Sequence, residues 1–198
     1  MKYLYVGCLF IFLLSACYQT PDVVPIFNPV EDPRGLDCIL ATDENGATIG
    51  TFPDCDPLGQ WIQTNLNSEE LKILDFPDTV TAQLATSLLK VRRAFAYPNP
   101  IGVNESLTIG FNGIDQHLVK IKLAVVNEGT QTVQQTTILS DRTDTIQLNI
   151  ASNIYNPGSY YRVYFQVLGD NDEIFIEGYG NIFICRSATV ENVEECFQ

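Results

Sequence analysis

Histidine, methionine and tryptophan occur once each in these 198 residues, so any chemistry that needs histidine has a single candidate, His117. A Ser-His-Asp site would require this residue as its base. The sequence also contains no G-x-S-x-G elbow, no H-E-x-x-H zinc motif and no phosphate-binding loop. These absences predict a protein that is not an enzyme and that holds no metal or cofactor. A glycosidase-type pair among the many carboxylates is the alternative.

Positive charge is scarce. Eleven Lys and Arg face 24 Asp and Glu, which gives a formal net charge of −13. Such a chain is repelled by nucleic acid and by anionic lipid, so we expect no nucleic-acid partner. The one basic cluster, Lys90-Val91-Arg92-Arg93, carries too few charges to indicate phosphate binding. We interpret it as a solvated face or a contact with another protein.

Long hydrophobic runs are also absent. The longest, Tyr3 to Leu14, has about a dozen residues, whereas a membrane-spanning helix needs roughly 20. With Lys2 before it, this run has the form of an export signal. An ordinary cleaved signal and an uncleaved anchor remain the alternatives to the lipid-modified signal considered next.

The apolar run ends in Leu14-Ser15-Ala16-Cys17, which resembles the lipobox of bacterial lipoproteins. The resemblance implies that residues 1–16 are removed as a signal peptide and that Cys17 carries acyl chains such as palmitate. Two or three chains on one residue hold a protein stably at a membrane. Residue 18 is tyrosine and not the aspartate that retains lipoproteins in the inner membrane of enterobacteria. The outer membrane is therefore the expected location.

Prolines recur every fourth residue in the segment that follows, residues 17–35. Each proline fixes its own φ and disfavours helix at the residue before it. We expect an extended tether that separates the body from the lipid. The alternative is an arm docked on the domain or on a partner, since the segment also carries Val23, Val24, Ile26 and Phe27.

Four cysteines remain in the body, and beyond the cytoplasm disulfides form and persist. Pairing by proximity in sequence predicts Cys38–Cys55 and Cys185–Cys196. A zinc site is the competing interpretation. It would need tight cysteine spacing or histidine partners, which this sequence does not offer.

Residues 36–90 are expected to form a small N-terminal β unit. A hairpin over residues 36–52 is predicted from alternating apolar residues around the turn at 43–46. Asp43 and Glu44 also suggest calcium, but no further ligands follow at loop spacing. Ser68 is a candidate helix cap. Alternation predicts a half-buried strand over 78–84, and helical spacing is the alternative for residues 85–95.

Residues 91–185 contain about seven apolar-alternating runs separated by Asn, Gly, Pro and Asp, a pattern typical of an all-β sandwich. Turns are predicted at 127–129 and 169–172. Residues 186–198 are expected to be an acidic C-terminal tail. Tyr, Phe, Val, Ile and Thr are plentiful in the body, which favours strands over helices.

A family resemblance lies in this half of the chain. Tyr97-Pro98-Asn99-Pro100, the strand 107–111, the turn at 127–129 and the Pro-Gly of 157–158 follow a recognisable order. This order resembles that of the immunoglobulin-like C-terminal domains of Bacteroidetes proteins exported by the type IX secretion system. It implies an immunoglobulin-like fold and a Bacteroidetes-like origin. It does not imply a secretion signal, because here the chain continues beyond the domain.

Two short triplets, Asp78-Thr79-Val80 and Asp144-Thr145-Ile146, match the O-glycosylation pattern of Bacteroidetes proteins. The resemblance implies glycans on Thr79 and Thr145. The alternative is that both are ordinary strand residues beside turns.

Two hypotheses for function follow. The first is a membrane-anchored, non-catalytic interaction subunit of a cell-envelope protein complex, with other envelope proteins as its partners. The second is a surface carbohydrate-binding module that uses exposed aromatic rings. Its candidates share one aromatic-rich stretch and one neighbouring strand: Tyr155, Tyr160, Tyr161, Tyr164 and Tyr179.

Overall fold

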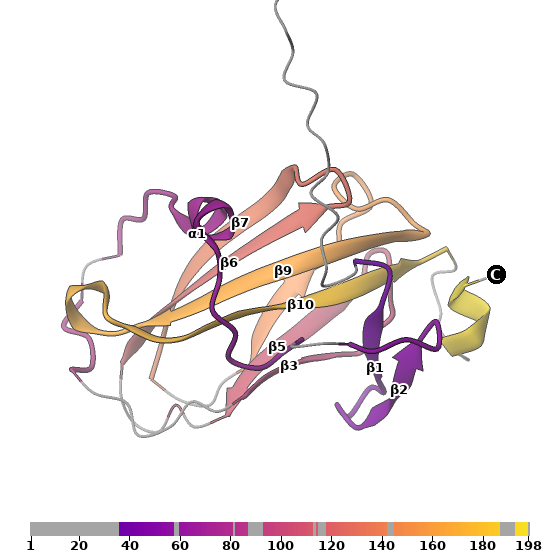
Figure 1. The fold of residues 1–198 in the computed structure, drawn as a ribbon, viewed down its shortest axis with the longest axis horizontal. Helices are drawn as coiled ribbons and strands as arrows, with labels where there is room; N and C mark the ends of the chain where they lie inside the picture. The colour runs from indigo at the N-terminus through magenta and orange to yellow at the C-terminus, as the bar shows by residue number, and fades with distance from the viewer. Residues whose placement is uncertain are drawn as a thin grey trace, which may run out of the picture. The chain divides into compact units, whose positions relative to one another are not determined.

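The computed structural model describes residues 36–57, 60–80, 82–86, 93–112, 114, 118–141, 145–186 and 193–197 (Figure 1). These residues belong to one compact, β-rich unit. Its elements are β1 (Ile39–Thr42), β2 (Thr48–Phe52), α1 (Ser68–Leu74), β3 (Arg93–Tyr97), β4 (Ile101–Gly102), β5 (Ser106–Asn112), β6 (Val119–Asn127), β7 (Thr132–Ser140), β8 (Ile146–Asn149), β9 (Ser159–Leu168), η1 (Asp170–Asp172), β10 (Ile174–Cys185) and η2 (Val193–Phe197).

Two sheets form the centre of the unit. One has the strand order β4-β10-β9-β6-β7 and the other the order β3-β5-β8. Neighbouring strands are antiparallel except β4 and β10, which run parallel. The seven longer strands of these sheets confirm the seven runs predicted from apolar alternation. The predicted turns at 127–129 and 169–172 join β6 to β7 and β9 to β10.

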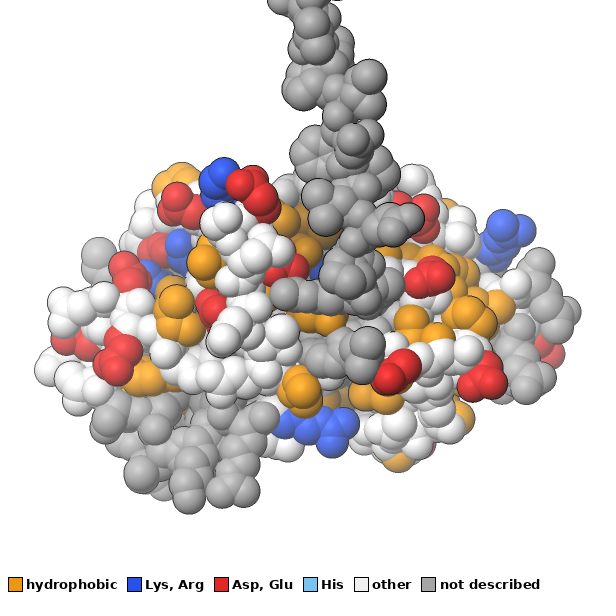
Figure 2. Space-filling view, in the orientation of Figure 1, with side chains coloured by type: hydrophobic (Ala, Val, Ile, Leu, Met, Phe, Trp, Pro, Cys, Tyr) orange, Lys and Arg blue, Asp and Glu red, His pale blue; other side chains and the backbone are white. Residues whose placement is uncertain are grey.

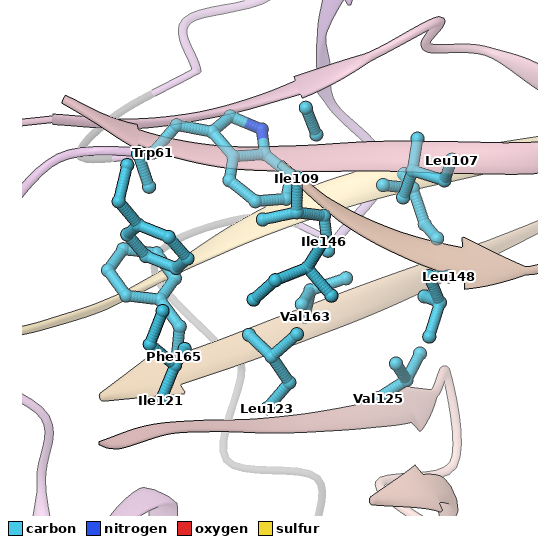
Figure 3. Close-up of a cluster of buried hydrophobic side chains, with 14 of the residues drawn as sticks. Trp61, Leu107, Ile109, Ile121, Leu123, Val125, Ile146, Leu148, Val163 and Phe165 are labelled. Atoms are coloured by element: carbon cyan, nitrogen blue, oxygen red, sulfur yellow. The ribbon is translucent and has the colours of Figure 1, made fainter. Parts of the chain in front are cut away.

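The main core lies between the two sheets (Figure 3). Alternate residues of each strand point into it, which is the direct consequence of the two-residue period of a strand. Figure 3 shows side chains of β5 and β8 facing those of β6 and β9. The contributing residues from these four strands include Leu107, Ile109, Ile146, Leu148, Ile121, Leu123, Val125, Val163 and Phe165.

Trp61 joins this core from outside the sheets. Its backbone N–H donates to the Tyr179 carbonyl of β10 (2.7 Å), and its carbonyl accepts from the Ala94 N–H of β3 (3.0 Å). The chain at Trp61 therefore connects the edges of both sheets. Its ring stacks on Phe165 at 6.3 Å and is 1% exposed. A side chain at Gly180 would overlap the Trp61 ring, so glycine is required there for this close packing.

Two side-chain amides complete the same edge of β10. Gln60 Oε1 accepts the Asn181 N–H (3.1 Å), and Asn99 Oδ1 accepts the Phe183 N–H (3.2 Å). The Asn99 Nδ2 group donates to the Asn181 carbonyl (2.9 Å). These amides take the place of a neighbouring strand between Trp61 and β4. Both Asn99 and Asn181 are fully buried, where an unpaired backbone group would be costly.

We call the side chains of Gln60, Asn99 and Asn181 the amide cluster. The β1–β2 hairpin is hydrogen-bonded to it. Gln60 and Asn181 both donate to the Cys38 carbonyl at 2.9 Å, while Asn99 donates to the Leu40 carbonyl at 3.0 Å. Thr42 and Asn99 also exchange a pair of backbone hydrogen bonds (2.8 and 3.2 Å). The hairpin therefore lies against the large sheet through specific polar contacts.

The hairpin predicted over residues 36–52 is confirmed, and so is the chemistry of its turn. Asp43 Oδ1 accepts the N–H groups of Asn45 and Ala47 at 2.9 Å. Gly46 has φ of +80°, a value that glycine adopts without strain. The Asp43 carboxylate thus stabilises the turn by accepting two of its backbone hydrogen bonds.

Helix α1 covers the outer face of the five-stranded sheet. Leu66 and Leu74 pack there against Ala124, Val126 and Tyr164. The helix begins after Asn67, whose Oδ1 accepts the N–H groups of Glu69 and Glu70 at 3.0 Å. Ser68 was expected as the cap. That prediction is wrong by one residue, because the carboxamide of Asn67 fills this role in a complete capping box.

Three further expectations differ from the structure. The described residues of 78–84 form no strand. Asp78 instead ion-pairs with lysines of β6, which holds the chain over the sheet without pairing to it. In 85–95, no helix occurs among the described residues, and residues 93–95 belong to β3. The C-terminal residues 193–197, predicted as an acidic tail, form η2, which is attached to the body by a disulfide.

The small N-terminal unit expected over 36–90 shares its packing with the rest of the chain. Trp61 lies in the main core, and Ile39 and Ala41 pack with Phe183 and Cys185 of β10. The described residues on both sides of the expected boundary near residue 90 belong to a single compact unit.

Several sequence predictions concern residues outside the described ranges. These are the signal peptide, Cys17, the proline-spaced tether, His117 and the first three residues of the basic cluster. Arg93, the last residue of that cluster, is exposed at the start of β3. Among the described helices, none is both long enough and apolar enough to cross a bilayer.

The amide cluster makes a direct prediction for stability. We expect Asn99→Ala to lower the free energy of unfolding by about 3 kcal/mol, because it leaves buried groups of β10 and β1 without partners. Asn149→Ala, at an exposed position of β8, should change it by less than about 0.5 kcal/mol. Urea unfolding followed by the fluorescence of the single tryptophan, Trp61, measures both. Equal stability of the two variants would contradict the assigned role of Asn99.

Candidate aromatic groove

An open groove lies where the β1–β2 hairpin, β9 and the C-terminal η2 meet. It is lined by Phe52, Pro53, Tyr160 and Phe197, and its volume is about 380 Å³. Figure 2 shows hydrophobic side chains gathered on this part of the surface, over the ends of β9 and β10, with acidic side chains around them. We call these four residues the aromatic groove.

The rings of the groove are stacked on one another. Phe197 lies parallel to Phe52, with ring centroids 5.6 Å apart, and parallel to Phe183, at 4.5 Å. Tyr160 is tilted against Phe183 at 4.7 Å. Phe183 is only 5% exposed, whereas Phe52, Tyr160 and Phe197 are half-buried. Three partly exposed rings therefore adjoin a buried aromatic ring.

Local structure fixes each ring in place. Phe52 ends β2 and pairs with Ile39 of β1. Tyr160 lies on the face of β9 opposite the main core, because its neighbour Tyr161 points inward. Phe197 follows Cys196 in η2. The groove is thus assembled from three segments that are far apart in sequence.

Both predicted disulfides are present, and each links one side of the groove to the body. Cys38–Cys55 closes the hairpin that carries Phe52 and Pro53. Cys185–Cys196 links η2 to the end of β10. Because Phe197 adjoins Cys196, the second bridge determines where that ring lies.

The electrostatic surroundings of the groove are acidic. Burial, together with the negative charges of Asp37 and Glu128, raises the pKa of the Tyr160 hydroxyl. Glu128 Oε1 also accepts the Tyr160 backbone N–H at 3.2 Å. A positive charge also lies near: Arg186 is beside Gly158, two residues before Tyr160. The charges that shift the pKa of the Tyr160 hydroxyl are nevertheless those of the two carboxylates.

A separate ionic cluster lies over β6. Lys120 contacts Asp78 (3.4 Å) and Asp172 (2.5 Å), and Lys122 contacts Asp78 (3.4 Å). Lys122 also donates to the Phe76 carbonyl at 2.9 Å. The Lys120, Lys122 and Asp78 side chains are only 10–12% exposed. This cluster fastens the segment after α1 to the sheet, which is a structural task.

Four of the five tyrosines proposed for sugar binding are buried. Tyr155, Tyr161, Tyr164 and Tyr179 have exposures of 0%, 1%, 6% and 1%. Tyr155 and Tyr161 face the main core, while Tyr164 and Tyr179 pack under α1. Strand alternation predicts that several of these candidates face the core, and all four are enclosed by the main core or by the packing under α1. They are therefore excluded as surface sugar-binding rings. Tyr160 alone of the five is half-buried.

The candidate modification and metal residues are dispersed. Thr79 is exposed in coil beside Asp78, and Thr145 is exposed just before β8. Within the described part of the chain, no three His, Cys, Asp or Glu side chains come close enough to hold a metal ion.

Sequence reasoning missed the groove and the amide cluster. Neither Phe52 nor Phe197 was singled out, since each occurs in a short segment without a motif. For the amide cluster, two signals were present: an asparagine between two prolines at position 99, and the single tryptophan next to Gln60 in an otherwise polar stretch.

The chain was also compared with known proteins. No protein-family model matches it, and no curated protein matches it. Two crystal structures of glycosyl hydrolase family 2 members from Bacteroides cellulosilyticus match 46% of this chain and 14% of theirs, with 17% and 16% identity and TM-scores of 0.31 and 0.29. The chain therefore spans about one seventh of the length of either glycosyl hydrolase.

The ionic cluster makes stability depend on pH. Burial raises the pKa of the Asp78 carboxyl, but the hydrogen bond and charge of Lys120, assisted by Lys122, outweigh burial and hold it below its usual value of 3.8. The stabilisation is therefore complete above about pH 4 and is lost as the pH falls through the folded-state pKa.

We expect Asp78→Asn to cost about 2 kcal/mol at pH 7 and progressively less below about pH 4. Thermal unfolding of both proteins between pH 7 and pH 2.5 measures the difference. A cost that stays constant over this range would show that the Asp78 charge does not act as described.

Proposed function

We propose that this protein is a membrane-anchored, non-catalytic interaction subunit of a cell-envelope complex in the outer membrane, and that the aromatic groove is its contact surface. The observation that carries the proposal is the set of three half-exposed rings, Phe52, Tyr160 and Phe197, beside a buried aromatic ring. Binding sites are commonly lined by hydrophobic and aromatic side chains of this kind.

The anchor is proposed from the sequence and supported by the cysteines. Leu14-Ser15-Ala16-Cys17 has the form of a lipobox. The two disulfides of the body fit a protein that leaves the cytoplasm, where thiols are kept reduced. Acyl chains on Cys17 would then place the groove near the outer membrane and the proteins that assemble there.

We further propose that residues 91–185 form an immunoglobulin-like sandwich, as the family resemblance implies. The order β3-β5-β8 corresponds to strands A, B and E of that fold, and β10-β9-β6-β7 to strands G, F, C and C′. The Tyr161 hydroxyl near the start of β9 accepts the Asn156 N–H at 2.7 Å. This contact has the position and spacing of the tyrosine corner of immunoglobulin-like domains.

A carbohydrate-binding module remains the second candidate function, with Tyr160 as the one tyrosine left of the five candidates. Tyr160 lies with Phe52 and Phe197 in the groove, and sugar rings pack on aromatic faces of this kind. In this form, both candidate functions use the same surface. Variants of the groove therefore test where binding occurs, and the identity of the bound molecule distinguishes the two functions.

The full chain, purified from detergent-solubilised membranes after cross-linking in cells, should bring with it at least one envelope protein. That protein should be lost with Phe197→Ala or Tyr160→Ala, which truncate groove rings. It should be retained with Ile174→Ala, which truncates a 48% exposed side chain at the other end of β10. Cys17→Ser should move the chain from the membrane to the aqueous fraction.

A chain that purifies alone as a monomer, or a partner retained by both groove variants, would contradict the proposed contact surface. A Cys17→Ser chain that stays in the membrane fraction would contradict the lipid anchor.

A further inference from the structure

Resting on the proposed function, we propose that the aromatic groove binds an extended, positively charged peptide segment of a partner protein. In this arrangement a proline or aliphatic side chain packs on the Phe52, Tyr160 and Phe197 rings, and flanking Lys or Arg side chains face the acidic rim.

The shape of the groove favours an extended peptide. Phe197 lies parallel to both Phe52 and Phe183, with interplanar angles of 11° and 21°, so the three rings share one orientation. Pro53 adds a further apolar surface beside them. Proline-rich segments dock on aromatic-lined grooves of this type, because a polyproline helix is already ordered and presents flat rings.

The charge around the groove selects a cationic occupant. Two of the three segments that supply lining residues carry an exposed carboxylate close by in sequence: Asp54 follows Pro53, and Glu195 precedes Phe197 by two residues. Asp37 and Glu128 act on Tyr160 itself. A cationic segment is attracted to this rim, whereas an acidic one is repelled.

The groove also offers ring faces to the cations themselves. Within the same molecule, the Arg162 guanidinium lies over the Tyr179 ring at 4.6 Å and the Lys122 ammonium over the Phe76 ring at 4.8 Å. A guanidinium of the partner can pack on Tyr160 or Phe197 in the same way.

The groove is preformed, which favours binding of a short segment. The hairpin side is held by Cys38–Cys55 and by the hydrogen bonds of Asn99 and Gln60, and the η2 side by Cys185–Cys196. Little ordering of the protein is then needed when the peptide binds.

The test uses the full chain in detergent micelles and fluorescein-labelled peptides, with binding measured by fluorescence anisotropy. The probe is RPLPPRPK. One matched control, EPLPPEPE, reverses its charge, and another, RSGSSRSK, keeps the cations but removes the apolar groups. We expect the probe to bind with a dissociation constant on the order of 10–100 µM, and each control to bind at least tenfold more weakly.

Variants locate the site. Phe197→Ala and Tyr160→Ala should each weaken binding of the probe about tenfold, and Ile174→Ala should leave it unchanged. The double variant Asp37→Asn/Glu128→Gln keeps the acceptor for the Tyr160 N–H but removes both charges, and it should weaken binding about fivefold. Raising the salt concentration from 50 to 500 mM should also weaken binding of the probe, because salt screens the carboxylates around the groove. Trp61 fluorescence confirms that each variant is folded.

Other occupants are separated in the same assay. A peptide of residues 18–35, which has three acids and one arginine, and the sugar cellohexaose are added as competitors. Displacement of the probe by either at a lower concentration than unlabelled RPLPPRPK would overturn the proposal in favour of the protein's own arm or of carbohydrate. Equal binding of RPLPPRPK and EPLPPEPE, or unchanged binding by both ring variants, would also overturn it.

Failure here is distinguishable from failure of the proposed function. If no peptide binds but Phe197→Ala still loses the co-purified envelope protein, the groove is a contact surface for a different partner chemistry. If the probe binds as expected but the chain purifies alone, the peptide preference holds and the envelope complex does not.

Discussion

The edge of β10 between Glu177 and Cys185 is the constraint on which the rest of the structure depends. Buried N–H and C=O groups on such an edge need partners. No single strand supplies them here. Trp61 and Thr64 donate backbone N–H groups at one end, β4 pairs at the other, and the side-chain amides of Gln60 and Asn99 serve the middle. One edge therefore draws together segments from residues 60–64 and 97–102.

The position of the aromatic groove follows from this arrangement. The amides that complete β10 also bond to the Cys38 and Leu40 carbonyls of β1, which places the hairpin and so Phe52. On the same face of β10, Phe183 supports the rings of Tyr160 and Phe197. A polar network thus positions an apolar surface, and the disulfides hold its outer parts. The rings are partly exposed because the fold fixes them there, and the proposed contact surface rests on that exposure.

The sequence predicts what depends on local patterns. Apolar alternation places the seven longer strands of the two sheets, and proximity of cysteines predicts both disulfides. Residues 78–84 alternate equally well, yet Asp78 is held by Lys120 and Lys122, and a tertiary ion pair replaces strand pairing. The amide cluster joins residues up to 143 positions apart, such as Asn181 and Cys38. The groove joins three distant segments. No local pattern encodes contacts of this kind.

Amide hydrogen exchange at Asn181 and Phe183 tests the central claim most directly, because their N–H groups bond only to side-chain oxygens across the β10 edge in the contacts described above. If Gln60 and Asn99 complete the sheet, both amides should exchange as slowly as those of the β9–β10 centre and report an opening free energy close to that of global unfolding. Exchange at the rate of a frayed, open edge strand would contradict the account. The β1–β2 hairpin and the aromatic groove beside it would then not be held in place by the edge of β10.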